Sequence, residues 1–132
     1  MREKILIVED NPQSMRLLEM VLRAKNYTFL KATDGEEALD IAMRERPDLI
    51  IMDIELPKIN GLAVTRKLRR TPEFSHVPII AVTARAMKGD RERVIGAGCD
   101  AYLPKPINPH ELPEVIAAML LQQRAKIPTP AE

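Results

Sequence analysis

Short apolar runs alternate with longer amphipathic stretches along the whole chain. Each apolar run ends in polar, Gly or Pro residues, which is typical of a buried β-strand. The predicted strands are Lys4–Val8, Tyr27–Ala32, Leu49–Met52, Val77–Val82 and Ala101–Leu103. The stretches between and after them repeat their apolar residues at helical spacing. They predict helices from Asn11 to near Asn26, from Asp34 to before Pro47, from Gly61 to Arg70, from Met87 to Ile95, and from Pro109 to about Gln123.

This alternation predicts a doubly wound α/β fold. Parallel neighbours in a sheet need crossover connections, and right-handed crossover helices pack back onto the sheet. Five strands alternating with five helices therefore predict a mostly parallel sheet with helices on both faces. In such folds ligands bind at the carboxyl ends of the strands, near the point where the strand order reverses. We expect the functional site among the residues that follow the strands.

The residues at these strand ends form a chemically consistent set. Glu9 and Asp10 follow the first strand, Asp53 the third, Thr83 the fourth and Lys105 the fifth. Clustered carboxylates raise one another's pKa unless a cation lies among them, and an all-oxygen site suits a hard ion such as Mg²⁺. An Asp carboxylate can also attack phosphorus, with a metal, a lysine and a hydroxyl stabilising the transferred oxygens. The set predicts phosphoryl chemistry and a metal-free protein that is less stable than the metal-bound form.

The size and composition are those of one globular domain. We place the domain at residues 1–124 of the 132-residue chain and predict a disordered tail over 125–132. The chain is 45% hydrophobic and 30% charged, and its net charge of +1 gives no general attraction to nucleic acid. The basic run Arg66–Arg70 lies on a predicted helix without aromatic residues for base stacking. A solvated helix face is therefore favoured over a docking patch.

The cysteine content and the hydropathy point to the cytoplasm. The single cysteine, Cys99, excludes an internal disulfide and any site built from several cysteines, which favours a reducing compartment. The N-terminus reaches acidic residues too soon for a secretory signal, and no apolar run approaches the roughly 20 residues of a membrane span. We expect a cytoplasmic protein with no membrane partner.

Five motifs occur in order along the chain: ILIVEDN, DGEEAL, PDLIIMDIELPKING, PIIAVTA and AYLPKPI. With them the chain, from Lys4 to about Gln123, resembles the receiver domains of response regulators in two-component signalling. The resemblance implies a flavodoxin-like (βα)5 fold with a five-stranded parallel sheet of order 2-1-3-4-5. The segment from Val82 to Ile107, with the expected lack of an output domain, is most similar to the stand-alone, DivK-like regulators of the bacterial cell cycle. Similar segments also occur in receivers of hybrid histidine kinases.

The resemblance implies a metal-dependent phosphorylation site. Asp53 matches the phosphoacceptor, and Glu9 and Asp10 match the acidic pair that organises Mg²⁺ or Mn²⁺. Asp10 would be the direct ligand, and Glu9 would act mostly through water. The main-chain carbonyl of Glu55 matches a further protein ligand, and Lys105 matches the cation that pairs with the phosphoryl group.

The resemblance also implies the parts of a conformational switch. Thr83 matches the hydroxyl that follows the phosphoryl group, and Ala84 is the small neighbour that leaves room for it. Tyr102 falls on the aromatic switch position, where a ring responds to the inward move of the hydroxyl. Pro106 is implied to follow a cis peptide bond that aims the lysine. Gly61 is the turn glycine that the loop after the acceptor retains.

The implied function is a phosphorylation-activated switch. A phosphohistidine on a sensor histidine kinase or phosphotransfer protein donates to Asp53, and the domain catalyses only its own phosphorylation and dephosphorylation. The donor is expected to dock near the first helix and the loop after the fifth strand. A downstream protein is expected at the face of the fourth helix, fifth strand and fifth helix, and no nucleic acid partner is expected. Glu55 and Arg85 flank the path of the hydrolytic water and could pair across it.

Other interpretations stay open at this point. Glu9 and Asp10 also fit an acidic helix start, and Thr83 fits a helix cap. Lys105–Pro106 could be a plain turn, and Tyr102 could be a half-buried core aromatic. A Mg²⁺-dependent phosphohydrolase of the haloacid-dehalogenase type needs its D-x-D motif on the first strand. A flavin- or nucleotide-binding module needs a Gly/Ser/Thr-rich loop there, where this chain has acids. A receiver used only for phosphorylation-independent protein contacts is the remaining alternative.

Overall fold

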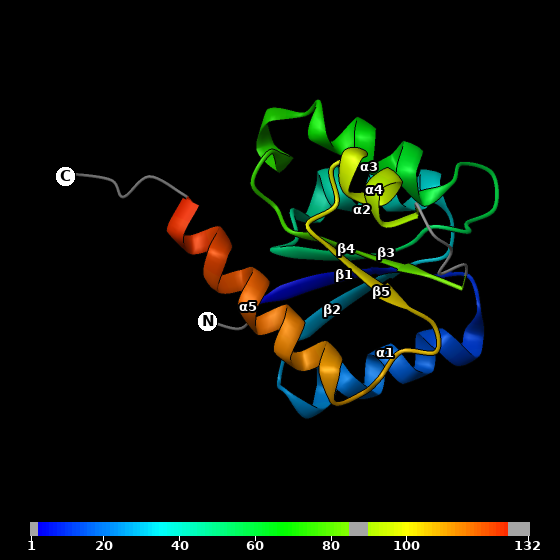
Figure 1. The fold of residues 1–132 in the computed structure, drawn as a ribbon, viewed down its shortest axis with the longest axis vertical. Coiled ribbons are helices and arrows are strands. Elements are labelled where there is room, and N and C mark those ends of the chain that lie inside the picture. Colours follow the sequence, from blue (N-terminus) through cyan, green and yellow to red (C-terminus); the bar gives the residue numbers. More distant parts are fainter. Residues whose placement is uncertain (1–2, 85–89, 127–132) are drawn as a thin grey trace.

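A parallel sheet is the centre of the fold. The computed structural model describes residues 3–84 and 90–126, and within them five parallel strands lie in the order β2-β1-β3-β4-β5 (Figure 1). The strands are β1 (Lys4–Val8), β2 (Thr28–Ala32), β3 (Leu49–Asp53), β4 (Ile79–Thr83) and β5 (Ala101–Pro104). The predicted fold class and the implied strand order are both confirmed.

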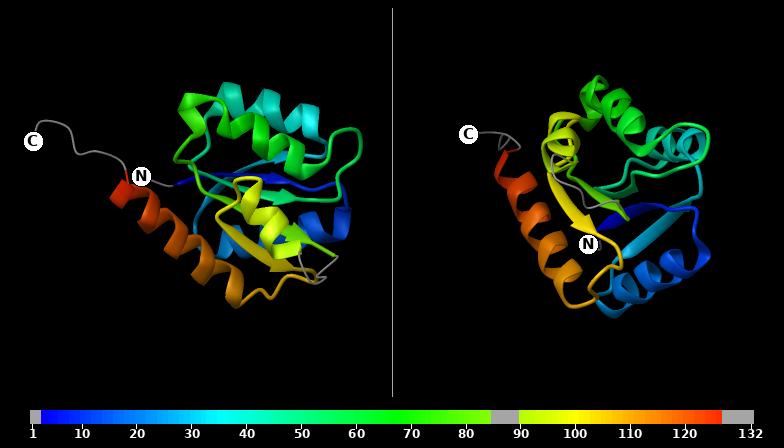
Figure 2. Two further views of the ribbon diagram at one scale, coloured as in Figure 1. Left: turned by 45° about the horizontal axis from the view of Figure 1, so that its top comes forward. Right: turned by 45° about the vertical axis from the view of Figure 1, so that its right-hand side comes forward.

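Helices cover both faces of this sheet. They are α1 (Pro12–Ala24), α2 (Gly35–Glu45), α3 (Gly61–Arg69), the short 3-10 helix η1 (Pro72–Phe74), α4 (Asp90–Gly96) and α5 (Glu111–Lys126). Helices α2, α3 and α4 lie on one face, and α1 and α5 on the other (Figure 1 and Figure 2). The side chains of β3 alternate between the two cores, Ile50 toward α2–α4 and Ile51 toward α1 and α5. None of the helices in the described part of the chain is long and apolar enough to cross a bilayer.

Side-chain caps set where helices begin. The Asn11 Oδ1 accepts hydrogen bonds from the backbone N–H groups of Gln13 at 2.9 Å and Ser14 at 3.0 Å. Pro12 occupies the first helical position, as predicted, because a proline there loses no helical hydrogen bond. Asp34 caps α2 in the same way. Each such cap is typically worth about 0.5–2 kcal/mol.

The start of β4 differs from the sequence prediction. The strand begins at Ile79, whereas the apolar run suggests Val77. The Val77 N–H donates to the carbonyl oxygen of Phe74 at 3.4 Å, in the turn that follows η1. Pro78 has no N–H to donate, so regular pairing with β3 starts one residue later.

Both ends of α5 also differ from the prediction. The helix begins at Glu111 rather than Pro109, because the Asn108 Oδ1 accepts from the next two available backbone N–H groups at 2.8 and 3.3 Å. It continues to Lys126, past the predicted end near Gln123.

Other bounds differ from the prediction by one or two residues: β2 begins at Thr28, β3 ends at Asp53, β5 ends at Pro104 and α1 ends at Ala24. Two further predictions concern residues that the structure does not describe, which are 1–2, 85–89 and 127–132. The predicted start of the fourth helix at Met87 lies outside the described residues, and α4 is described from Asp90 onward. The predicted disordered tail also stays a prediction, although α5 crosses its expected first residue at position 125.

The strand order reverses beside β1, and this brings two acidic strand ends together. In the ladder between β1 and β3, Val8 lies opposite Met52, so Glu9 and Asp53 each follow one of these paired residues. In the ladder between β3 and β4, Asp53 lies opposite Val82. The carboxyl ends of three neighbouring strands therefore meet at one edge of the sheet, where this fold class binds ligands.

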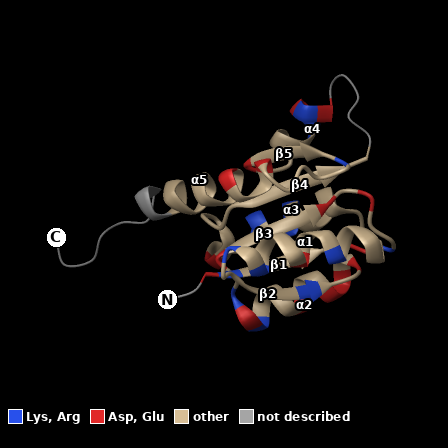
Figure 3. Ribbon diagram, turned by 90° about the horizontal axis from the view of Figure 1, so that it is seen from below, with Lys and Arg blue, Asp and Glu red and all other residues tan. Residues whose placement is uncertain are grey.

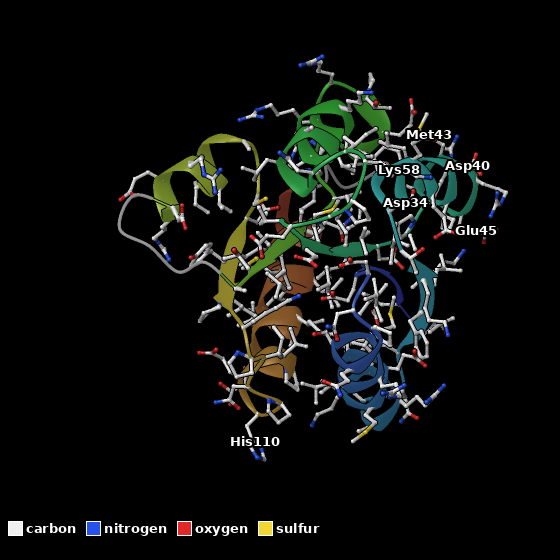
Figure 4. All side chains as sticks on the ribbon, turned by 90° about the vertical axis from the view of Figure 1, so that its right-hand side faces the viewer. Asp34, Asp40, Met43, Glu45, Lys58 and His110 are labelled. Carbon is white, nitrogen blue, oxygen red and sulfur yellow. The ribbon has the colours of Figure 1, made fainter. Side chains whose placement is uncertain are left out.

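The loop from β3 to α3 passes close to the end of β3. The Gly61 N–H donates to the carbonyl oxygen of Ile54 at 3.0 Å, and a Cβ at Gly61 would overlap the carbonyl oxygen of Asp53. Lys58, in the left-handed region with φ 66°, places its Nζ 3.5 Å from Asp34 Oδ2 at the start of α2 (Figure 4). The path of the chain directly after Asp53 therefore requires glycine at position 61.

Substitution of Gly61 tests this requirement. We expect Gly61→Ala to lower the free energy of unfolding by roughly 1–3 kcal/mol, because the added methyl group would overlap the backbone of Asp53, which cannot move without shifting β3. Gly96→Ala is the matched control, since a Cβ there meets nothing within 4 Å, and it should cost nothing. Urea denaturation followed by far-UV circular dichroism measures both. Equal stability of Gly61→Ala and the native chain would show that position 61 does not require glycine.

Candidate functional site

Three carboxylates gather at the carboxyl edge of the sheet. Glu9 follows β1, Asp10 comes next, and Asp53 is the last residue of β3. Glu9 and Asp53 are buried, with 1% and 2% of their surface exposed, whereas Asp10 is exposed. Each of the three offers an oxygen within 4.8 Å of an oxygen of the others. The structure thus brings together the acids that the sequence singled out.

The ammonium group of Lys105 bridges the two buried carboxylates. Its Nζ lies 2.9 Å from Glu9 Oε1 and 3.2 Å from Asp53 Oδ2. The Lys105 N–H donates to the carbonyl oxygen of Thr83 at 2.8 Å, which ties the loop after β5 to the end of β4. The peptide bond between Lys105 and Pro106 is cis, as the resemblance implied. The lysine therefore reaches both acids from the loop after β5, which is an edge strand of the sheet.

Backbone amides complete the contacts of the buried acids. The Glu55 N–H donates to Asp53 Oδ1 at 3.0 Å, and the Asn11 N–H donates to Glu9 Oε2 at 3.0 Å. Glu9 is thus turned inward to a lysine and an amide. Asp10 is the most accessible of the three carboxylates.

The charge balance of the site raises the pKa of Asp53. Burial is the largest cause and the charge of Glu9 the next, and together they outweigh Lys105, so the pKa rises from 3.8 to about 7. Burial by itself would lower the pKa of Lys105, but its hydrogen bonds and charge interactions with Glu9 and Asp53 prevail and raise it. One ammonium group therefore does not offset the combined effect of burial and the charge of Glu9 on Asp53.

The donor set fits a divalent metal ion. Carboxylate oxygens are the ligands that hard ions such as Mg²⁺ and Mn²⁺ prefer. Oxygens of the three acids lie within 4.8 Å of one another, and burial together with the charge of Glu9 raises the pKa of Asp53 despite Lys105. Asp10, Asp53 and Glu9 are the side chains that could hold such an ion.

The end of β4 is held by a side chain that the sequence analysis did not pair with it. The Thr83 Oγ1 donates to Glu55 Oε2 at 2.5 Å, and the Ala84 N–H donates to Glu55 Oε1 at 3.0 Å. The sequence predicts a role for the main-chain carbonyl of Glu55 and a pairing of its side chain with Arg85, which lies outside the described residues. An acid two positions after Asp53 was the available signal, but spacing alone does not show which strand its carboxylate reaches.

Tyr102 lies in β5, beside the strand that carries Thr83. It pairs in the ladder with Ala81 and is half-buried against the core beneath α3 and α4. The pKa of its phenol is raised by burial first and then by the negative charges of Asp90 and Glu55. The phenol therefore senses charge from both α4 and the site. This position fits both a core residue and a switching residue.

The fold and the site define a class of protein. A five-stranded parallel domain carries a buried Asp at the end of its third strand, an acidic pair after the first and a lysine after the fifth. The family model for the response regulator receiver domain matches residues 5–117, and the chain belongs to this family. It is a receiver domain of a two-component system, which is a signalling domain and not a metabolic enzyme. Domains of this family act with histidine kinases or phosphotransfer proteins and bind Mg²⁺ at an acidic pocket.

The relatives narrow the class. The polar-differentiation response regulator DivK of Brucella anthropi is 47% identical over 120 residues, covering 91% of this chain and 98% of that relative. The protein of the same name from Brucella ovis is 46% identical over the same length. The resemblance to DivK-like regulators stated from the sequence is thereby confirmed.

Solved structures agree with this assignment. The receiver domain of sensor histidine kinase PA1611 from Pseudomonas aeruginosa PAO1, which has a magnesium ion coordinated in its active-site cleft, has a TM-score of 0.84 at 39% identity. That match covers 91% of this chain and 98% of the other. A CheY-like receiver domain protein from Methanospirillum hungatei JF-1 has a TM-score of 0.87 at 29% identity, covering 96% and 100%.

The raised pKa of Asp53 predicts how stability depends on pH without metal. Because this carboxyl binds its proton more tightly in the folded chain, it lowers stability progressively as the pH rises from about 4 to 7. We expect Asp53→Asn, which cannot ionise, to raise the unfolding free energy at pH 8 by roughly 1–3 kcal/mol, and by much less at pH 5. Thermal melting in EDTA at both pH values measures this.

Asp40→Asn is the matched control for this experiment. Asp40 lies on α2 with 77% of its side chain exposed, so its substitution should give no such pH-dependent gain. If Asp53→Asn changed the unfolding free energy equally at pH 5 and pH 8, the ionisation of Asp53 would not be what lowers the stability of the native chain.

Proposed function

We propose that this receiver domain takes a phosphoryl group from a phosphohistidine onto Asp53. The observation that supports the proposal is the buried Asp53 carboxylate at the end of β3, among Glu9, Asp10 and Lys105. A carboxylate oxygen of Asp53 forms a bond to phosphorus while the phosphorus–nitrogen bond of the donor breaks. The departing imidazole keeps the bonding electrons and takes up a proton. The domain thereby catalyses its own phosphorylation, and water later removes the group.

The same residues would neutralise the charge of the transferred group. Asp10, Asp53, Glu9 and the main-chain carbonyl of Glu55 would hold Mg²⁺ or Mn²⁺, which when bound supplies positive charge to the phosphoryl oxygens. Lys105 supplies a second positive charge, because its Nζ already contacts Asp53 Oδ2 at 3.2 Å. Glu9 orients that ammonium group through its 2.9 Å contact.

Phosphorylation would then shift the population of two conformers. Thr83 and Ala84, at the end of β4, would donate hydrogen bonds to phosphoryl oxygens. Tyr102, in the neighbouring strand, would respond to the new position of the Thr83 hydroxyl. Pro106 would shape the loop that positions Lys105. Gly61 would shape the loop that leads away from Asp53. The cis bond before Pro106 and the close passage of Gly61 support these roles.

The donor and the target would use different surfaces. We place the donor, a sensor histidine kinase or phosphotransfer protein, beside α1 and the loop after β5. A largely apolar groove there is lined by Leu17, Met20, Val21, Ala24, Lys25, Pro109 and Pro113. We place the target protein at the face of α4, β5 and α5. Exposed Ile95 and the few charges along the described part of α5 support this surface (Figure 3).

The proposal extends to the boundaries and the location of the protein. The receiver domain comprises residues 1–124, followed by a tail over 125–132, of which α5 includes the first two. The protein acts in the cytoplasm. The buried, free Cys99 is consistent with a reducing compartment.

Acetyl phosphate tests the acceptor directly. We expect it to label the native chain in the presence of Mg²⁺ and not in EDTA, with a phosphorylated band on a phosphate-retarding gel. Asp53→Asn should not be labelled, because an amide is not a nucleophile here. Asp40→Asn, on the outer surface of α2 (Figure 4), should be labelled like the native chain. Failure of acetyl phosphate and of a phosphohistidine donor to label the folded native chain would favour the contact-only alternative.

Thermal melting tests the metal site separately. Because an ion that binds only the folded state stabilises it, Mg²⁺ at about 100 times its dissociation constant should add about 2.7 kcal/mol. Asp10→Ala should lose most of this gain, whereas Asp40→Ala should keep it. If Mg²⁺ leaves the melting temperature unchanged while Asp10→Ala raises it, the acids repel one another but do not bind the ion.

A further inference from the structure

The Glu55 carboxylate links the end of β3 to the end of β4 through hydrogen bonds. Both of its oxygens accept a hydrogen bond, Oε2 from the Thr83 hydroxyl at 2.5 Å and Oε1 from the Ala84 N–H at 3.0 Å. The backbone supports this approach, since Ile54 donates its N–H to the carbonyl oxygen of Val82 at 2.9 Å. Glu55 thus leaves β3 directly beside the residues that leave β4.

The two donors that Glu55 occupies are those that the proposed function gives to the phosphoryl group. Thr83 has one hydroxyl proton and Ala84 has one backbone N–H, so neither can serve two close acceptors fully. A carboxylate and a phosphoryl group both present anionic oxygens to these donors. The two groups therefore compete for the same hydrogen bonds.

We propose that the Glu55 side chain is a built-in competitor of the phosphoryl group. This inference rests on the proposed function of Asp53. In the unphosphorylated protein Glu55 holds the Thr83 hydroxyl and the Ala84 N–H, and phosphorylation requires its carboxylate to leave both donors. The side chain is only half-buried, so it can return to water when displaced. Glu55 therefore sets the ease with which Asp53 is phosphorylated.

The length of the side chain matters as much as its charge. The carboxylate reaches β4 through two methylene groups, and an aspartate at the same position would be one methylene shorter. Glu55→Asp therefore keeps the negative charge beside the site but withdraws it from Thr83 and Ala84. Glu55→Ala removes both the charge and the contacts. Neither change alters the main-chain carbonyl that the proposed function assigns to the metal.

The experiment measures the initial rate of labelling by acetyl phosphate with saturating Mg²⁺. We expect Glu55→Ala to be labelled about tenfold faster than the native chain, because a charge-assisted pair of hydrogen bonds no longer has to be broken. Glu55→Asp should also be faster if occupation of the donors is the cause. Glu73→Ala, which removes an exposed charge from η1, is the matched control and should react at the native rate.

A second measurement does not depend on phosphorylation. In the metal-free protein, the amide proton resonance of Ala84 should move upfield in Glu55→Ala and in Glu55→Asp, because its carboxylate acceptor is gone. An unmoved Ala84 resonance would overturn the contact itself. A native labelling rate for Glu55→Asp together with a faster Glu55→Ala would overturn competition for donors and leave only charge repulsion.

The two proposals fail in different ways. If Asp53 is not the acceptor, the native chain and every Glu55 variant remain unlabelled, while the Ala84 resonance still reports the contact. If Glu55 does not compete, the native chain is labelled, Asp53→Asn is not, and Glu55→Ala reacts at the native rate.

Discussion

The structure depends on two carboxylates buried at the ends of adjacent strands and offset by one ammonium group. Glu9 and Asp53 lie almost wholly inside the protein, and Lys105 is 2.9 Å and 3.2 Å from them. Burying a charge is costly unless it is paired, and here two buried negative charges share one positive partner. Burial first and the charge of Glu9 second raise the pKa of Asp53 to about 7 despite the presence of Lys105. A site with this excess of negative charge suits a divalent cation.

The parallel sheet is what makes this arrangement possible. Because the strand order reverses beside β1, the ends of β1 and β3 are neighbours, and β4 and β5 follow on one side. All carboxyl ends of a parallel sheet face the same edge, so four segments distant in sequence bring an acid pair, a buried aspartate, a hydroxyl and a lysine to one place. Gly61 then lets the chain turn away close to Asp53.

Glu55 connects this charged centre with the end of β4. Its N–H donates a hydrogen bond to Asp53, and its carboxylate accepts hydrogen bonds at the end of β4. Strand β4 pairs with β5, which carries Tyr102. A carboxylate beside an already negatively charged site is unfavourable unless it accepts hydrogen bonds, and Thr83 and Ala84 donate them to Glu55. Under the proposed function, this internal carboxylate takes the hydrogen bonds that a phosphoryl group on Asp53 would need.

The sequence by itself determined the fold class, most element positions and the identity of the acids, hydroxyl and lysine. Hydrophobic periodicity and turn residues act locally, so apolar runs and caps such as Asn11 with Pro12 reveal where strands end and helices begin. The start of β4 and both ends of α5 were missed because they depend on individual hydrogen bonds. Only the tertiary structure decided that the Glu9 side chain is buried while Asp10 is exposed, and that the Glu55 carboxylate accepts a hydrogen bond from Thr83. These contacts join residues up to 96 positions apart and depend on which strands are neighbours in the sheet.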